Sequence, residues 1–162
     1  MDAGEVEEAP GHLSDVEAAA LPLTGLTAWR AVVTKGGRGT DGGRNVLVTG
    51  IGGGVALMAL AFARARGAGV WVSSGSEKKI KSAEELGAKG GVSYKEEGWE
   101  KKLLEQLPKD RKYLDVIVDG AGGDVVDKGV KLLKVCRPFS THCNLITRTA
   151  HSIRIGYRRA AS

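Results

Sequence analysis

A run of glycines follows a short apolar segment in the first half of the chain. Residues 45–49 (Asn-Val-Leu-Val-Thr) are mostly apolar and β-branched, Gly50-Ile-Gly-Gly-Gly54 comes directly after them, and an alanine-rich segment begins at Val55. This order predicts a buried strand, a glycine turn and a helix. The start of a helix presents unpaired N–H groups and a partial positive charge, so it can hold a phosphate where glycine lets the backbone come close. The candidate phosphate-binding residues are Gly50, Gly52, Gly53, Gly54 and Val55.

The alternative to a phosphate site is a turn that serves only the fold. The predicted strand, turn, helix and following strand form a unit of the size and order used to bind dinucleotides. This context favours the nucleotide site over the purely structural turn.

The residues at the end of the second predicted strand indicate which dinucleotide would bind. A carboxylate there would accept from the ribose 2′-hydroxyl of NAD and would repel the 2′-phosphate of NADP. The sequence instead reads Ser73-Ser-Gly-Ser-Glu-Lys-Lys79, which offers hydroxyl and ammonium donors suited to a phosphate. We expect Glu77 to point to solvent from the first turn of the next helix. The cofactor prediction is therefore NADPH (NADP) in preference to NADH.

The elements that would position these residues alternate along the chain. Strands are predicted at residues 45–49, 70–72, 91–94 and 113–118, and helices at 55–66, 76–86, 99–107 and 125–134. Such alternation is typical of an α/β fold, here a doubly wound parallel sheet (Rossmann) covered by helices on both faces. We expect all four strands to pair in parallel.

The region before the first strand is predicted to contain a lead-in, two helices and a loop. Residues 1–16 form a loose acidic lead-in, and Ser14 and Glu17 have the spacing of a capping box that opens a short helix through Ala20. Residues 24–33 predict a second helix, and residues 36–43 a glycine-rich loop. The dinucleotide-binding domain is predicted to span residues 17–134.

The character of the chain changes after residue 134. Residues 135–162 contain five Arg, no Lys and no acid, and both cysteines. We expect an Arg-rich tail of unrelated character that packs poorly and adds at most one irregular strand, leaving the sheet incomplete at its C-terminal end. An ordinary terminal extension is the alternative.

Composition and charge exclude several classes of function. The net charge is +5, but the lysines of the middle region alternate with glutamates, which indicates solvated helix faces rather than a nucleic-acid surface. The spacing of Cys136 and Cys143 fits neither a zinc knuckle nor a redox pair. The chain has no signal-peptide pattern and no apolar run of about 18 residues, so a cytoplasmic protein without membrane contact is expected.

Four segments, in this order, resemble landmarks of the medium-chain dehydrogenase/reductase superfamily. They are Ala18-Ala-Ala-Leu-Pro-Leu-Thr-Gly-Leu-Thr-Ala-Trp29, Val46-Leu-Val-Thr-Gly-Ile-Gly-Gly-Gly-Val-Ala56, Glu85-Leu-Gly-Ala88 with Tyr94, and Asp115-Val-Ile-Val-Asp119. The resemblance covers about residues 12–134. Because Ala56 replaces a third glycine and Ile51 replaces the first glycine of zinc-dependent members, the chain is closer to the zinc-independent quinone oxidoreductase-like branch.

The resemblance implies roles for individual residues. Thr27 would approach the nicotinamide end, residues 52–55 the pyrophosphate, and Gly120, after the fourth strand, is a further cofactor-binding candidate. The residues implied at the adenosine phosphate are Ser74, Ser76, Lys79 and Tyr94. No catalytic residue and no metal ligand is assigned, because the substrate domain of the family has no counterpart in this chain and the three His form no cluster of metal-ligand spacing.

The activity implied is NADPH-dependent hydride transfer to a quinone, an enone or another carbonyl-type small molecule. The expected partners are such a substrate and, as one option, a second copy of the chain in a homodimer. A catalytically silent NADPH-binding or interaction module is the main alternative. A short-chain dehydrogenase is less favoured, because its Tyr-x-x-x-Lys pair is absent: the fourth residues after Tyr94, Tyr113 and Tyr157 are Gly98, Ile117 and Ala161.

Overall fold

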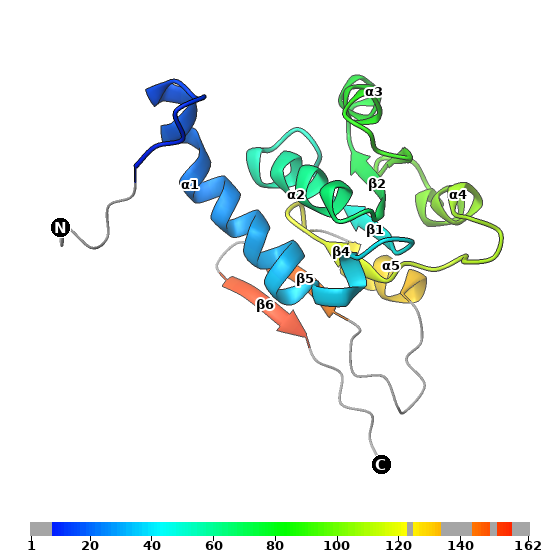
Figure 1. Cartoon of the computed structure of the whole chain (residues 1–162). Helices are drawn as coiled ribbons and strands as arrows, with labels where there is room; N and C mark the ends of the chain where they lie inside the picture. The colour runs from blue at the N-terminus through cyan, green and yellow to red at the C-terminus, as the bar shows by residue number, and fades with distance from the viewer. Residues whose placement is uncertain (1–7, 123–124, 134–143, 150–151, 157–162) are drawn as a thin grey trace, which may run out of the picture.

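A sheet of six strands forms the centre of the computed structural model, which describes residues 8–122, 125–133, 144–149 and 152–156 (Figure 1). The strands lie in the order β3-β2-β1-β4-β5-β6. Their bounds are β1 Asn45–Val48, β2 Gly69–Ser74, β3 Gly90–Ser93, β4 Val116–Val118, β5 Asn144–Thr149 and β6 Ser152–Gly156. Strands β1 to β5 pair in parallel, and β6 pairs antiparallel to β5. The predicted parallel pairing of the first four strands is confirmed.

Helices connect the strands and cover both faces of the sheet. Their bounds are α1 Asp15–Trp29, α2 Gly54–Ala65, α3 Glu77–Glu85, α4 Trp99–Gln106 and α5 Val125–Leu132. Two shorter turns follow α1, a π-helix η2 at Arg30–Lys35 and a 3-10 helix η3 at Gly37–Thr40. The strand order and the crossovers are those of a doubly wound Rossmann-like fold.

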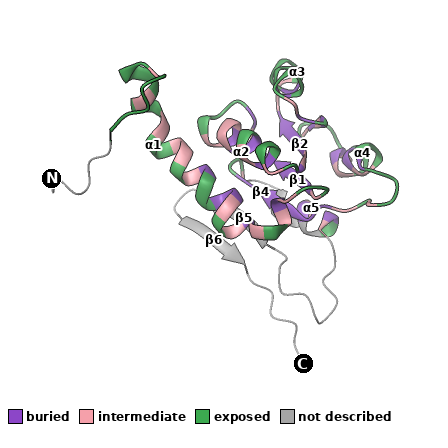
Figure 2. Ribbon diagram, viewed as in Figure 1, coloured by how far each residue is buried: buried purple, intermediate pink, exposed green. Residues whose placement is uncertain are grey.

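The hydrophobic core has two halves, one on each face of the sheet (Figure 2). Alternate residues of a strand point to opposite faces, so Val46 and Val48 of β1 join one half and Leu47 joins the other. The first half contains buried residues of α1, α2 and α3. The second contains those of α4 and α5, including the fully buried Trp99. Burial on both faces explains why the strands read as continuous apolar runs.

The prediction of two separate N-terminal helices is wrong. One helix, α1, runs through Pro22. Its capping box is present as predicted, because Ser14 N and Oγ donate to Glu17 Oε2 at 2.9 and 2.8 Å and Glu17 N donates back to Ser14 Oγ at 3.4 Å. The helix also packs along α2, where Trp29 meets Phe62 edge to face at 5.6 Å. Tertiary packing and the cap thus outweigh the local cost of a proline.

The C-terminal region also differs from the prediction. Two regular strands replace the single irregular strand expected, since β5 pairs with β4 from Val116↔Asn144 onward and β6 pairs back from Thr149↔Ser152. The shift in composition misled the prediction, because runs rich in Thr and Ile favour strands whatever charges lie between them. Cys136, Cys143, His142 and His151 lie outside the described residues.

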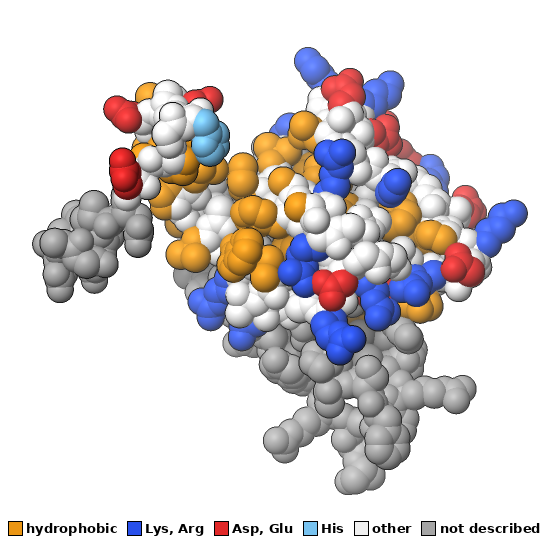
Figure 3. Space-filling model, in the orientation of Figure 1, with side chains coloured by type: hydrophobic (Ala, Val, Ile, Leu, Met, Phe, Trp, Pro, Cys, Tyr) orange, Lys and Arg blue, Asp and Glu red, His pale blue; other side chains and the backbone are white. Residues whose placement is uncertain are grey.

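The surface carries mixed charge and one apolar region. Lys and Arg side chains are interspersed with Asp and Glu over α3 and α4, while hydrophobic side chains gather where α1 meets α2 (Figure 3). Along α1, Val16, Leu23 and Leu26 are each more than two thirds exposed. Among the described helices, none is long and apolar enough to cross a membrane.

Candidate cofactor-binding site

The glycine turn between β1 and α2 has a backbone that requires glycine. Gly50 and Gly52 have φ values of +65° and +108°, a region that other residues rarely adopt. Ile51 lies between them, almost fully buried, and its N–H donates to Ser73 O at 3.0 Å, which ties the turn to the end of β2. Gly53 is the N-cap of α2, and no side chain caps this helix. The first N–H groups of α2 are therefore available to an anionic ligand.

A cavity of about 540 Å³ lies at this turn, above the carboxyl ends of β1 and β4. After β1 the chain crosses to β2 on one side, and after β4 it crosses to β5 on the other side. The cavity therefore lies at the topological switch point, where this fold binds ligands. Its lining comes from α1 and η2 (Leu26, Thr27, Arg30, Ala31, Lys35), from β1, the turn and α2 (Val48, Thr49, Gly50, Gly53, Gly54, Val55, Ala56), and from the end of β4 (Val118, Asp119, Gly120).

A buried polar network joins the two strand ends beneath the cavity. The Thr49 hydroxyl donates to Asp119 Oδ1 and accepts from the N–H of Gly120 at 3.0 Å. The Asp119 carboxylate also accepts from the N–H groups of Ala121 and Gly122, each at 3.2 Å. Thr49 and Asp119 are 1% and 4% exposed, so these bonds are shielded from water. The network holds the segment after β4 against the glycine turn.

Close contacts explain why glycine stands at two further points of the site. A Cβ on Gly50 would lie 3.3 Å from Cβ of Ala121, in the segment after β4. A Cβ on Gly54 would lie 2.8 Å from Cγ2 of Thr24. Gly54 therefore permits the close approach of α1 to α2, a reason that the sequence did not reveal.

Lys79 lies across the glycine turn. A Cβ on Gly52 would lie 2.6 Å from Cδ, 3.0 Å from Cε and 3.2 Å from Nζ of this lysine. The side chain reaches back from the first turns of α3 to the start of α2. An ammonium group thus stands beside the predicted phosphate-binding backbone.

The end of β2 carries hydroxyl groups and no carboxylate. Ser74 is buried, its hydroxyl donates to Ile51 O at 3.4 Å, and it accepts from the N–H of Ser76 at 3.3 Å. Beyond it, a Cβ on Gly75 would lie 2.6 Å from Oη of Tyr94 and 2.8 Å from Cε of Lys95. Tyr94 and Lys95 therefore extend from the end of β3 over the end of β2.

The predicted site residues fall into two adjoining groups. Those that line the cavity are Thr27, Gly50, Gly53, Gly54, Val55 and Gly120. Those that lie around Gly52 and the end of β2 are Ser74, Ser76, Lys79 and Tyr94. The Thr27 hydroxyl donates to Leu23 O at 2.7 Å, within its own helix.

Sequence reasoning missed several residues of this region, namely Arg30, Lys35, Thr49, Lys95 and Asp119. Arg30 had a usable signal, because a residue three positions after Thr27 shares its helix face. Thr49 and Asp119 stand in two of the family-like segments, but no local pattern reveals their contact, which spans 70 residues of sequence.

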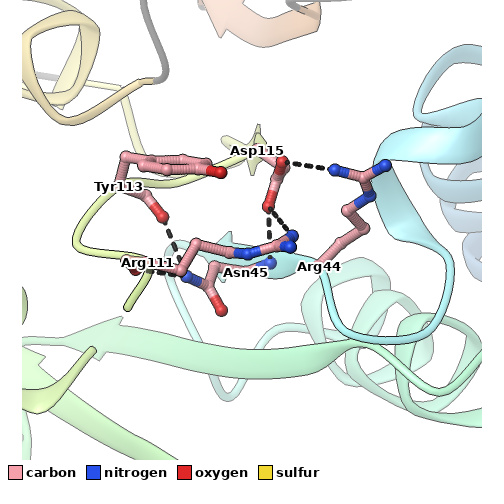
Figure 4. Close-up of polar contacts among 5 residues, drawn as sticks. All are labelled: Arg44, Asn45, Arg111, Tyr113 and Asp115. Atoms are coloured by element: carbon pink, nitrogen blue, oxygen red, sulfur yellow. Dashed lines mark hydrogen bonds and ion pairs between the residues drawn. The ribbon is translucent and has the colours of Figure 1, made fainter. Parts of the chain in front are cut away.

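A second polar cluster lies at the opposite end of β1, away from the cavity (Figure 4). The buried Asp115 carboxylate accepts from Asn45 N at 2.9 Å and pairs with Arg44 at 3.4 Å and Arg111 at 3.6 Å. The Asn45 side chain donates to Tyr113 O at 2.9 Å. This cluster fixes the segment before β4 against the start of β1.

The described residues offer no metal centre. Among them, no group of three or more His, Cys, Asp or Glu side chains is placed to hold a metal ion, so the residues there do not fit a zinc site.

Comparisons with known proteins agree with this architecture. The family model described as "Zinc-binding dehydrogenase" matches residues 54–135. The chain is 53% identical to the zinc-type alcohol dehydrogenase-like protein YogA of Leptosphaeria maculans over 80% of its own length and 37% of that protein's. It is 34% identical to the mitochondrial NAD(P)H oxidoreductase RTN4IP1 of Danio rerio, over 83% of this chain and 34% of that one.

Solved structures give the same picture. A structure titled as an NAD-dependent alcohol dehydrogenase has a TM-score of 0.70 and 38% identity, over 78% of this chain and 36% of that one. The quinone oxidoreductase from Thermus thermophilus, solved also with NADPH, has a TM-score of 0.67 and 28% identity. The match covers 80% of this chain and 40% of that one.

The chain spans a little over a third of the length of these relatives. Its parallel sheet, its glycine turn and these similarities lead to one conclusion. The chain belongs to the medium-chain dehydrogenase/reductase superfamily, whose members here are oxidoreductases that include alcohol dehydrogenase-like and quinone oxidoreductase-like proteins.

Proposed function

We propose that this chain is the cofactor-binding part of an NADPH-dependent oxidoreductase that reduces a quinone, an enone or another carbonyl-type small molecule. The observation that supports this most is the position of Lys79, whose ammonium group lies at the glycine turn beside a β2 end without a carboxylate. When bound, the nicotinamide would supply the hydride. The residues of this chain would bind and orient the cofactor.

Each part of the site would bind a different part of the cofactor. The N–H groups of Gly54 and Val55 would hold the pyrophosphate at the start of α2, because no side chain caps this helix. The N–H of Gly53 already donates to Gly50 O at 3.3 Å. Thr27 and Gly120, which both line the cavity, would contact the nicotinamide end. Lys79 and Tyr94, with the hydroxyl groups of Ser74 and Ser76, would bind the 2′-phosphate.

The choice between the two dinucleotides is a finer part of the proposal. Some relatives are named for NAD(P)H, one similar structure is titled NAD-dependent, and another was solved with NADPH. We favour NADPH because a 2′-phosphate needs donors where this chain has hydroxyl and ammonium groups.

Replacing Lys79 tests this assignment. Lys79→Ala is expected to lower the affinity for NADPH by about ten- to a hundredfold, since a hydrogen bond to a charged group contributes about 1.5 to 3 kcal/mol, and to leave NADH binding nearly unchanged. Fluorescence titration with both cofactors measures this. Lys78→Ala, at the neighbouring exposed lysine, is the matched control and should change neither affinity. Equal weakening of NADPH and NADH by Lys79→Ala would refute the assignment.

A catalytically silent NADPH-binding module is the second candidate. It is favoured by the cavity itself, where the only described carboxylate is Asp119, already bonded to Thr49 and to backbone N–H groups. NADPH oxidation in the presence of a small quinone or enone separates the candidates. Turnover supports the oxidoreductase, and cofactor binding without turnover supports the module.

Three further points belong to the proposal. No zinc is expected to be needed, a homodimer is one expected assembly, and the protein is expected in the cytoplasm. Metal analysis of the purified chain, its mass in solution and cell fractionation test these points in turn.

A further inference from the structure

We propose that Lys95 is a second cation for the 2′-phosphate of the cofactor and so helps to set the preference for NADPH over NADH. This inference rests on the proposed function and adds a specificity-determining residue to it. Lys95 follows β3 closely in the chain, whereas Lys79 belongs to α3. The two lysines would therefore reach one phosphate from different elements.

The side chain of Lys95 lies against the end of β2. Its Cε would lie only 2.8 Å from a Cβ on Gly75, and the hydroxyl oxygen of Tyr94 would lie 2.6 Å from the same point. Both side chains therefore extend across Gly75, just past the strand end at which a dinucleotide fold distinguishes a ribose hydroxyl from a phosphate. A side chain larger than hydrogen at position 75 would displace them.

Lys95 and Lys79 both lie near the end of β2. The strand order β3-β2-β1 places the end of β2 between the glycine turn after β1 and the segment after β3. Lys79 lies over Gly52 of that turn, and Ile51 beside it bonds to Ser73 and Ser74 at the end of β2. Lys79 therefore lies over the turn next to the end of β2, and Lys95 lies over Gly75 just past that end.

The carboxylate next to Lys95 in the sequence is already paired. The adjacent carboxylate of Glu96 forms an ion pair with Lys102, and this hydrogen bond and the charge of Glu96 raise the pKa of Lys102. Within the part of the chain that the structure describes, neither Lys95 nor Lys79 has an ion-pair partner of its own.

The charge of the ligand calls for two cations. A phosphate monoester carries about −1.5 to −2 charges near neutral pH, so one ammonium group leaves it incompletely neutralised. Two lysines near the serine hydroxyls at the end of β2 match that charge. NADH carries no such phosphate, so Lys95 would add little to its binding.

The test uses the adenosine half of the cofactor, because the described site for it lies within this chain. The full chain is titrated calorimetrically with 2′,5′-ADP and with 5′-AMP, which differ only in the 2′-phosphate. Lys95→Met is expected to weaken 2′,5′-ADP by about tenfold and to leave 5′-AMP unchanged. Lys95→Arg should retain most of the affinity for 2′,5′-ADP, since it keeps the charge. Lys101→Met, at an exposed lysine of α4, is the control and should change neither affinity.

The outcomes separate this inference from the proposed function. If Lys79→Met weakens 2′,5′-ADP and Lys95→Met does not, the role of Lys95 is refuted while the NADPH site stands. If Lys95→Met weakens 5′-AMP and 2′,5′-ADP equally, Lys95 does not recognise the 2′-phosphate, and the inference fails as well. If the unmodified chain binds 5′-AMP as tightly as 2′,5′-ADP, the NADPH assignment and the inference fail together.

Discussion

At the scale of single residues, the site depends on a pair of strand ends held by two side chains. The Thr49 hydroxyl is both a donor to Asp119 and an acceptor from Gly120 N–H, and Asp119 in turn accepts from the next two N–H groups. Because both side chains are buried, loss of the hydroxyl leaves polar groups without partners.

Thr49→Val tests this pair, since valine keeps the shape of threonine and lacks its hydroxyl. We expect the free energy of unfolding to fall by about 1 to 3 kcal/mol, and NADPH binding to weaken because Gly120 lines the cavity. Urea denaturation and fluorescence titration measure the two effects. Thr49→Ser keeps the hydroxyl and should retain the NADPH affinity. A valine variant as stable and as tight-binding as the unmodified chain would contradict this role.

The Asp115 cluster at the other end of β1 should affect stability alone. Asp115→Ala leaves Asn45 N–H and two arginines without their buried acceptor, so we expect a loss of about 2 to 4 kcal/mol in chemical denaturation. Arg44 is 39% exposed in its side chain, and Arg44→Ala should cost less than about 1 kcal/mol. NADPH affinity, measured where each variant is folded, should stay unchanged. A selective loss of NADPH affinity would show that this end of the sheet contributes to the site.

At the scale of the element, α1 begins with a titratable cap. Hydrogen bonds from the backbone N–H and then the hydroxyl of Ser14 lower the pKa of Glu17 from its ordinary 4.5. A carboxylate whose pKa is lowered by folding stabilises the folded state at any pH above its ordinary pKa. This contribution is lost as the pH falls through the lowered pKa.

The thermal midpoint of the chain should therefore fall on acidification partly through Glu17. Glu17→Gln removes the titrating group. The thermal midpoint of this variant should therefore depend less on pH in the range below the ordinary pKa of glutamate. Glu84→Gln, in α3, is the matched control. Calorimetric scans across the acid range compare the three proteins, and an unchanged pH dependence in Glu17→Gln would exclude the cap as its source.

Some helices and strands could be predicted from the sequence and others could not. The path from β1 through the glycine turn to α2 was predictable because apolar period, glycine content and helix start all agree over residues 45–66. Pro22 misled the prediction of α1, since the contacts of α1 with α2 carry no local signal. The strands β5 and β6 were missed because a change in composition was given more weight than the β-branched residues.

At the scale of the whole molecule, the sheet brings three chain segments to one edge. The glycine turn after β1, the serines that end β2 and the Tyr94–Lys95 pair after β3 come together only through the strand order. The donors at the end of the second predicted strand indicated Lys79, and the family resemblance added Tyr94. Neither predicted Lys95, whose contact with Gly75 depends on the pairing of β2 with β3. The domain limits at residues 17 and 134 stay a prediction, and β5 extends the sheet beyond the second limit.

A comparison of the two cofactors shows most directly whether this edge of the sheet is an NADPH site. The full chain is titrated with NADPH and with NADH under the same conditions, and cofactor fluorescence reports binding. We expect NADPH to bind at least about tenfold more tightly, the contribution of one charge-assisted hydrogen bond or more. Equal affinity for the two cofactors, or tighter binding of NADH, would contradict the assignment.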